Sequence, residues 1–320
     1  MKKIIMSLFA VCFAGSAVGG WNRDAYSKLN SLIVSSIRHY EQNCRYSESK
    51  TDSSKVYICV DGLQYPFPYD SISNAYFFSL KNRPSKRVRH RLKKKFEAYF
   101  VRTWLEGDRF VVGLFLKRGR IDEREDFWTE TDRMAYVHEY CEEDGKWRKW
   151  VLNETKRNFD IPKDNPLNLM VVSCIKDFRE HYKEGIMYSV ERMGNTEMAK
   201  KTYVCEDALQ EPFPYDCIEN VFHFSRYNKI TGKLEKLLKK CVKKRYLGSG
   251  LPTFFVNMGF EEKDIVVFLS NGDVKTKTKC NGLKKETVVL IGECGWCDYT
   301  FRYSEVSGKW ELVKSEYFVM

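Results

Sequence analysis

The sequence predicts an α+β fold arranged as two tandem homologous domains, in each of which helices pack on an antiparallel sheet. Three observations lead to this prediction. One segment of the chain is repeated, apolar residues recur at helical spacing before each copy, and apolar runs typical of strands follow each copy. The composition, 43% hydrophobic and 15% aromatic, is sufficient for a large core and excludes an intrinsically disordered chain.

The repeat is centred on residues 57–70, which return as residues 203–216. Both copies contain aromatic-x-Cys, Asp-x-Leu-Gln and Pro-Phe-Pro-Tyr-Asp in the same order. A period this long indicates duplication of a whole domain and not a solenoid. We therefore predict homologous domains at 21–155 and 163–320, joined by the polar segment 153–165.

Each copy is expected to begin with one amphipathic helix, because apolar residues recur at helical spacing over 26–37 and over 167–178. The repeated segment is then expected to form a short strand, a turn and a second helix that opens near Pro68 or Pro214.

The last third of each copy changes to the pattern of strands. Apolar runs at 110–116 and 265–269 each precede a turn that contains glycine, and the segments 134–140 and 287–291 are predicted as further strands. These strands supply the antiparallel sheet of each domain.

Residues 1–19 have the features of a secretory signal peptide: Lys2 and Lys3, an apolar stretch over 4–13 and small residues at 17–19. The apolar stretch is too short to span a bilayer and no comparable run follows it, which predicts a secreted protein without a transmembrane segment. An N-terminal membrane anchor is the alternative. Secretion would make disulfides the expected use of most of the 11 cysteines.

Three short elements point to a known family. Aromatic-x-Cys ends at Cys59 and at Cys205, an Ile-x-x-Ala-like segment follows at 72–75 or 218–221, and Asp-Ile-Val-Val-Phe occupies 264–268. In these elements the chain resembles the ribonuclease-like secreted effectors of plant-pathogenic fungi, particularly powdery mildews. The resemblance implies the fold of the small guanyl-specific fungal ribonucleases and a role in virulence. A cystatin-like or other secreted protein-binding module is the alternative.

The resemblance also implies that an early cysteine of each copy pairs with a late one at the end of a sheet strand. It pairs Cys59 with Cys141, and Cys205 with Cys294 or Cys297. Each bond would close a long loop and stabilise its domain by about 2–4 kcal/mol.

Catalysis is not expected. Ribonucleases of the family resembled use a glutamate base, a histidine acid and an arginine on the phosphate. The second copy has no histidine after His223, whereas the first has His138 on a predicted strand with Arg124 and Glu125 nearby. A lone histidine on a strand is more often structural, so an active secreted endoribonuclease is kept only as an alternative.

No cofactor and no metal site are predicted, since the chain has no P-loop, dinucleotide fingerprint or HExxH sequence. Cys294 and Cys297 have the CxxC spacing of half a zinc site, but no second pair completes it and structural disulfides are the expected use.

Two basic segments, 81–95 and 229–245, lie at corresponding places in the two copies, and the net charge of +11 favours an anionic partner. The partner predicted on these grounds is host RNA or a host protein. The alternative is a solvated helix face whose leucines pack inward. The candidate nucleic-acid-binding residues are Lys86, Arg87, Arg89, Arg91, Lys93, Lys94, Lys239, Lys240, Lys243 and Lys244.

Overall fold

The computed structural model describes residues 23–43, 56–61, 63, 67–80, 95–120, 123, 127–152, 162–181, 201–206, 209–210, 212–224, 251–278 and 286–319. The side chains of 23–27, 69, 251–252, 273–294 and 319 are not part of this description. The predicted signal peptide and both basic segments lie outside the described residues, apart from Lys95.

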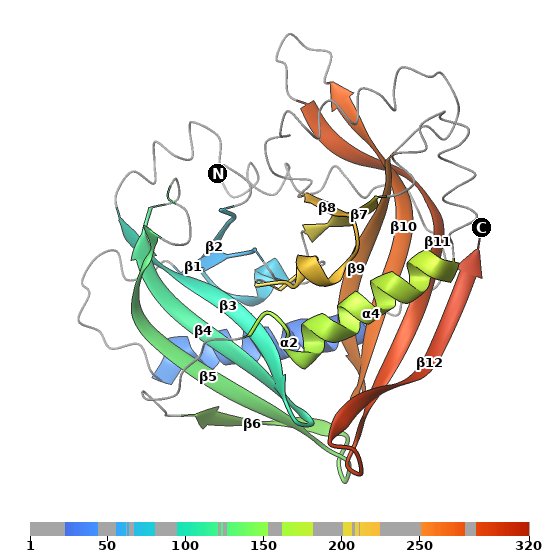
Figure 1. The fold of residues 1–320 in the computed structure, drawn as a ribbon. Coiled ribbons are helices and arrows are strands. Elements are labelled where there is room, and N and C mark those ends of the chain that lie inside the picture. Colours follow the sequence, from blue (N-terminus) through green and yellow to red (C-terminus); the bar gives the residue numbers. More distant parts are fainter. Residues whose placement is uncertain are drawn as a thin grey trace.

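The elements of the first half are α2 (Arg23–Asn43), β1 (Val56–Cys59), β2 (Ala75–Phe78), β3 (Phe96–Glu106), β4 (Arg109–Gly119), β5 (Thr129–Cys141) and β6 (Lys146–Leu152). Those of the second half are α4 (Pro166–His181), β7 (Thr202–Cys205), β8 (Val221–Phe224), β9 (Leu251–Glu261), β10 (Asp264–Thr278), β11 (Glu286–Ser304) and β12 (Lys309–Val319). Figure 1 shows two sheets that diverge from a common base.

The predicted fold class, helices packed on an antiparallel sheet, is wrong. The described chain is mostly β, with two six-stranded mixed sheets and one α-helix in each half. Sheet 1 has the order β2-β1-β3-β4-β5-β6, and sheet 2 repeats it as β8-β7-β9-β10-β11-β12. The short strand β1 is parallel to both β2 and β3, and β7 is parallel to both β8 and β9. The remaining strands form an antiparallel meander.

The second helix predicted in each repeated segment is absent from the described residues. Only a single 3-10 turn forms, at Tyr69–Ser71 and at Tyr215–Cys217. Asn74 and Asn220 then adopt positive φ values of 56° and 50°, a conformation that ends a helical turn and that asparagine tolerates better than most residues. The aromatic residues that follow favour a strand, and they form β2 and β8.

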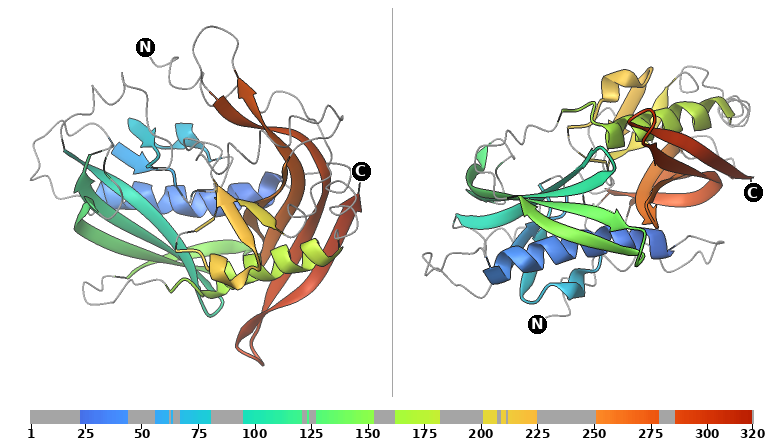
Figure 2. Two further views of the ribbon diagram at one scale, coloured as in Figure 1. Left: turned by 45° about the horizontal axis from the view of Figure 1, so that its top comes forward. Right: turned by 90° about the horizontal axis from the view of Figure 1, so that it is seen from below.

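The two predicted N-terminal helices are confirmed as α2 and α4, and their apolar faces are buried. The buried side chains are Leu29, Leu32, Ile33, Ile37 and Tyr40 on α2, and Leu167, Met170, Val171, Cys174, Ile175 and Phe178 on α4. Each helix also reaches the other half: α2 contacts β9 as well as β4 and β5, and α4 contacts β3 as well as β10. Seen from below in Figure 2, the helices lie on opposite sides of the molecule.

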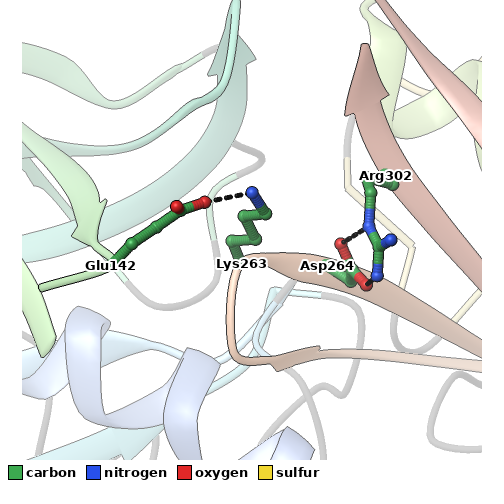
Figure 3. A network of polar contacts seen from close by, with 4 residues as sticks. All are labelled: Glu142, Lys263, Asp264 and Arg302. Carbon is green, nitrogen blue, oxygen red and sulfur yellow. Dashed lines mark hydrogen bonds and ion pairs between the residues drawn. The ribbon is translucent and has the colours of Figure 1, made fainter. Parts of the chain in front are cut away.

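One hydrophobic cluster joins the two halves, because apolar residues of both sheets and both helices belong to it. The rings of Phe110 on β4 and Phe260 on β9 are 4.9 Å apart between centroids. The hairpins at the base add polar links: the Trp310 indole N–H donates to the carbonyl oxygen of Gly107 at 2.8 Å, and Lys263 forms an ion pair with Glu142 (Figure 3). The duplicated segments are therefore packed as one unit.

The strands predicted from apolar runs are confirmed within β4, β5, β10 and β11. The turn predicted at Gly272 is wrong, since β10 continues past it through a register shift between Asn271 and Gly272. Strands β6 and β12 were not predicted, and neither were β3 and β9. Each of β3 and β9 follows a basic segment. Those segments lack the apolar pattern that predicts a strand, so the position at which each strand begins could not be recognised.

Candidate nucleic-acid interface

Each sheet has an inner face, which packs against the helices, and an outer face, which points the other way. Because side chains alternate along a strand, inner residues of β3–β6 such as Tyr99 and Val112 enter the shared core. On the outer face of sheet 1, Phe78, Phe100, Phe115 and other apolar residues form a second cluster around Trp128.

The outer face of strands β3–β6 is rich in cations, and we call it the basic face. Its residues are assigned from the alternation and the register of the four strands. Its charged members are Arg102, Arg109, Lys117, Arg133, Lys146 and Arg148, against Glu106, Glu130 and Glu139.

Aromatic rings lie beneath and beside these cations. Arg102 lies over the ring of Phe115 at 5.5 Å, and Lys117 lies 5.0 Å from the ring of Phe100. Both phenylalanines are buried, whereas Trp150 on the edge strand β6 is 45% exposed. The basic face therefore combines charge with an accessible indole, the two features that single-stranded nucleic acids need for binding.

Two of the cations are held only weakly by their acidic neighbours. Arg109 lies 3.8 Å from Glu139, and Arg148 lies 3.9 Å from Asp144. The side chains of Arg109 and Arg148 are 54% and 53% exposed. Exposed pairs at this separation contribute little to stability, about 0–1 kcal/mol, so an incoming phosphate can replace the carboxylate.

The outer face of sheet 2 carries opposite charges at corresponding positions. Asp264 begins β10 as Arg109 begins β4, and Glu311 follows Trp310 as Arg148 follows Trp147. Arg302 takes the place of Glu139 and binds Asp264 through two hydrogen bonds of 2.9 and 2.6 Å (Figure 3). The basic character is therefore a property of sheet 1 and not of the repeat.

The nucleic-acid-binding residues predicted from the sequence, Lys86 to Lys94 and Lys239 to Lys244, all lie outside the described residues. Sequence reasoning missed the basic face, because its cations are scattered singly over 102–148 and only the strand order brings them together.

The predicted catalytic alternative finds no support in the position of His138. Its side chain is on the inner face of sheet 1, 1% exposed, and its Nε2 atom lies 3.0 Å from the Ser36 hydroxyl. Burial, with a smaller effect of Lys149, lowers the pKa of His138 to about 3, so the ring is neutral at physiological pH. Arg124 and Glu125 lie outside the described residues.

The predicted disulfide between Cys59 and Cys141 is wrong. Cys141 is a free thiol, and strands β3 and β4 separate β5 from the β1 strand of Cys59. Three strand spacings are about 14 Å, twice what a disulfide can bridge. A bond from Cys205 to Cys297 is also absent, because Cys297 is a free thiol and β9 and β10 lie between the two strands. The side chain of Cys294 lies outside the description.

No group of three or more His, Cys, Asp or Glu residues able to hold a metal occurs in the described part of the chain. Among its helices, none has the length and apolar character needed to cross a membrane. Comparisons with protein-family models, with curated proteins and with solved structures gave no match.

Proposed function

We propose that this protein binds single-stranded RNA through the basic face of sheet 1 and does not cleave it. The observation that carries the proposal is the difference in charge between the two outer faces. The two sheets have the same strand order, but Arg109 and Arg148 of sheet 1 correspond to acidic residues in sheet 2. Cations that neutralise phosphates release counterions, so binding should be salt-dependent and largely independent of sequence.

The exposed apolar side chains favour a nucleic acid over a protein partner. Most of those that the structure describes are scattered singly, as are Tyr76, Leu169 and Val306. Single exposed apolar residues are normal for a protein surface and do not define a docking patch. A role as a secreted effector acting on host RNA belongs to the same proposal, and it depends on removal of residues 1–19, which N-terminal sequencing of the exported protein would test.

The experiment measures the binding of a labelled single-stranded RNA by fluorescence anisotropy over about 50 to 200 mM salt. We expect Arg109→Gln with Arg148→Gln to weaken binding and to reduce the slope of log K against log salt by about 1.4, the value for two lost contacts with a single strand. The matched control is Lys309→Gln with Lys314→Gln, which removes the same charge from the outer face of sheet 2.

The control should bind nearly as well as the unchanged protein. An equal loss in both variants would mean that only the total charge matters and would overturn the assignment of the face. Binding that is undetectable or insensitive to salt would overturn the proposed function itself.

A further inference from the structure

Trp150 is the most exposed aromatic side chain of the basic face. Its exposed fraction is 45%, whereas Phe100 and Phe115 are buried. It lies on β6, the edge strand of sheet 1, and pairs with Val137 of β5. Within the described part of the chain it takes part in no hydrogen bond and no ring stacking. The solvent-facing part of the indole is therefore open to a ligand.

The outer side of β6 carries two cations before this indole. Because side chains alternate along a strand, Lys146, Arg148 and Trp150 all point to the outer side, with about 7 Å from one to the next. All three are exposed, whereas the residues between them are partly buried. This spacing is close to that between the phosphate and the base of one nucleotide. The strand therefore presents two sites for phosphates followed by one for a base.

The surface beside Trp150, toward the middle of the sheet, is apolar. Val137 lies directly across from it and Ala135 follows on the same face of β5, and both are buried. Gly113 lies next to Ala135 on β4, and the ring of Trp104 lies against it, where an added Cβ atom would come within 2.6 Å. Apolar surroundings favour the flat face of a base over a phosphate at this position.

The corresponding place in sheet 2 has no aromatic ring. On β12, Lys314 takes the place of Trp150 and Glu311 that of Arg148, as the pairing of β12 with β11 shows. The indole and the cation beside it therefore occur together in sheet 1 and are both replaced in sheet 2.

We propose, building on the RNA-binding function proposed for this face, that Trp150 stacks on an unpaired base whose phosphate is bound by Arg148. Every base has a π-face, so this contact accepts any sequence. In a duplex the faces of the bases are covered by their neighbours, so a duplex can reach only the cations. Trp150 is therefore the residue that makes the basic face select RNA with unpaired bases over double-stranded RNA.

The test measures binding by fluorescence anisotropy with three RNAs: a single strand, a duplex of the same sequence, and the same single strand with abasic sites. Trp150→Leu should weaken binding of the intact single strand by at least about fivefold, the lower limit for loss of one base–aromatic stack. It should leave binding of the duplex and of the abasic strand nearly unchanged. Trp150→Phe, which keeps a ring, should recover part of the loss.

The slope of log K against log salt separates stacking from charge. It should be the same in Trp150→Leu as in the unchanged protein, because no cation is removed. The urea midpoint should also stay the same, since the side chain is on an exposed edge strand. Phe318→Leu is the matched control, because Phe318 is 41% exposed on the edge strand β12 of sheet 2. It should bind all three RNAs as the unchanged protein does.

Two results would overturn the role of Trp150: no loss of single-strand binding in Trp150→Leu, or an equal loss with all three RNAs. Salt-dependent binding by the unchanged protein would leave the proposed function standing in either case. If the unchanged protein bound none of the three RNAs, both the role of Trp150 and the proposed function would be overturned.

Discussion

The Nε2 atom of His138 lies 3.0 Å from the hydroxyl oxygen of Ser36, inside the contact between β5 and α2. The Ser36 hydroxyl donates to the Leu32 carbonyl at 2.9 Å, so it accepts from His138, whose Nε2 carries the proton. The other ring nitrogen is buried and finds no partner among the described residues. A charged imidazolium there would have an unsatisfied second donor, which is why the neutral ring is favoured.

His138 should make the protein sensitive to acid. Its folded pKa of about 3 lies below the unfolded value of 6.5, so its stabilising effect is complete above pH 6.5 and is lost as the pH falls toward 3. At pH 4 the expected loss is about 3 kcal/mol, from about 1.4 kcal/mol per pKa unit. Urea unfolding at pH 7 and pH 4 measures this loss in the unchanged protein and in His138→Phe. Phenylalanine is chosen because Phe301 occupies the corresponding position in the second half.

The variant should lose less stability between pH 7 and pH 4 than the unchanged protein does. The control is the same comparison between pH 7 and pH 8, both above the unfolded pKa of 6.5, where the difference in stability between the two proteins should not change. Parallel pH profiles for the unchanged protein and His138→Phe would contradict the prediction.

Asp298 should have the opposite pH dependence. It lies directly across from Glu316 on β12, and burial, followed by Glu316 and Glu261, raises its pKa from 3.8 to about 6. A raised carboxyl pKa favours the folded state at low pH, and that contribution is lost as the pH rises through 6. We expect Asp298→Asn to raise the free energy of unfolding at pH 8 by about 1–2 kcal/mol, after allowance for solvent screening, and to have little effect at pH 4. A gain that is the same at both pH values would contradict this explanation.

The two equivalent tryptophans at the base should differ in their contribution to stability. Trp310 donates to Gly107 of the other half, whereas the buried indole N–H of Trp147 has no acceptor among the described residues. Replacement of either by phenylalanine removes a similar apolar area, so the difference isolates one hydrogen bond. Trp310→Phe should cost about 0.5–1 kcal/mol more than Trp147→Phe in chemical denaturation. Equal costs would show that the hydrogen bond contributes nothing net.

The cysteines of the reduced protein should react at very different rates. The thiolate is the reactive form, and the pKa of Cys297, raised to about 12, leaves almost none of it at pH 8. Cys217 is exposed, so iodoacetamide should label it well before Cys174 or Cys297. Peptide mapping after timed alkylation measures the order, and early labelling of Cys297 would show that the core at α4 opens readily.

Local patterns predicted the local elements well. The repeat, the buried faces of α2 and α4, and the strands containing 110–116 and 265–269 follow from spacing and apolar runs, which act over a few residues. The helix expected after Pro68 failed because Asn74 ends the turn and an aromatic strand follows. Strand β3 was not predicted because the basic segment before it has no apolar pattern that would mark the beginning of a strand.

The sequence by itself determined that one segment is duplicated, that each copy starts with a buried helix, and that basic residues outnumber acidic ones. Only the tertiary structure decided which distant side chains meet. Asp177 accepts from Tyr299, and His138 lies against Ser36. Arg109 and Arg148 share the outer face of sheet 1, where the corresponding residues of sheet 2 are Asp264 and Glu311. These relationships depend on strand order and register, and a shift of one residue in register would move each side chain to the opposite face.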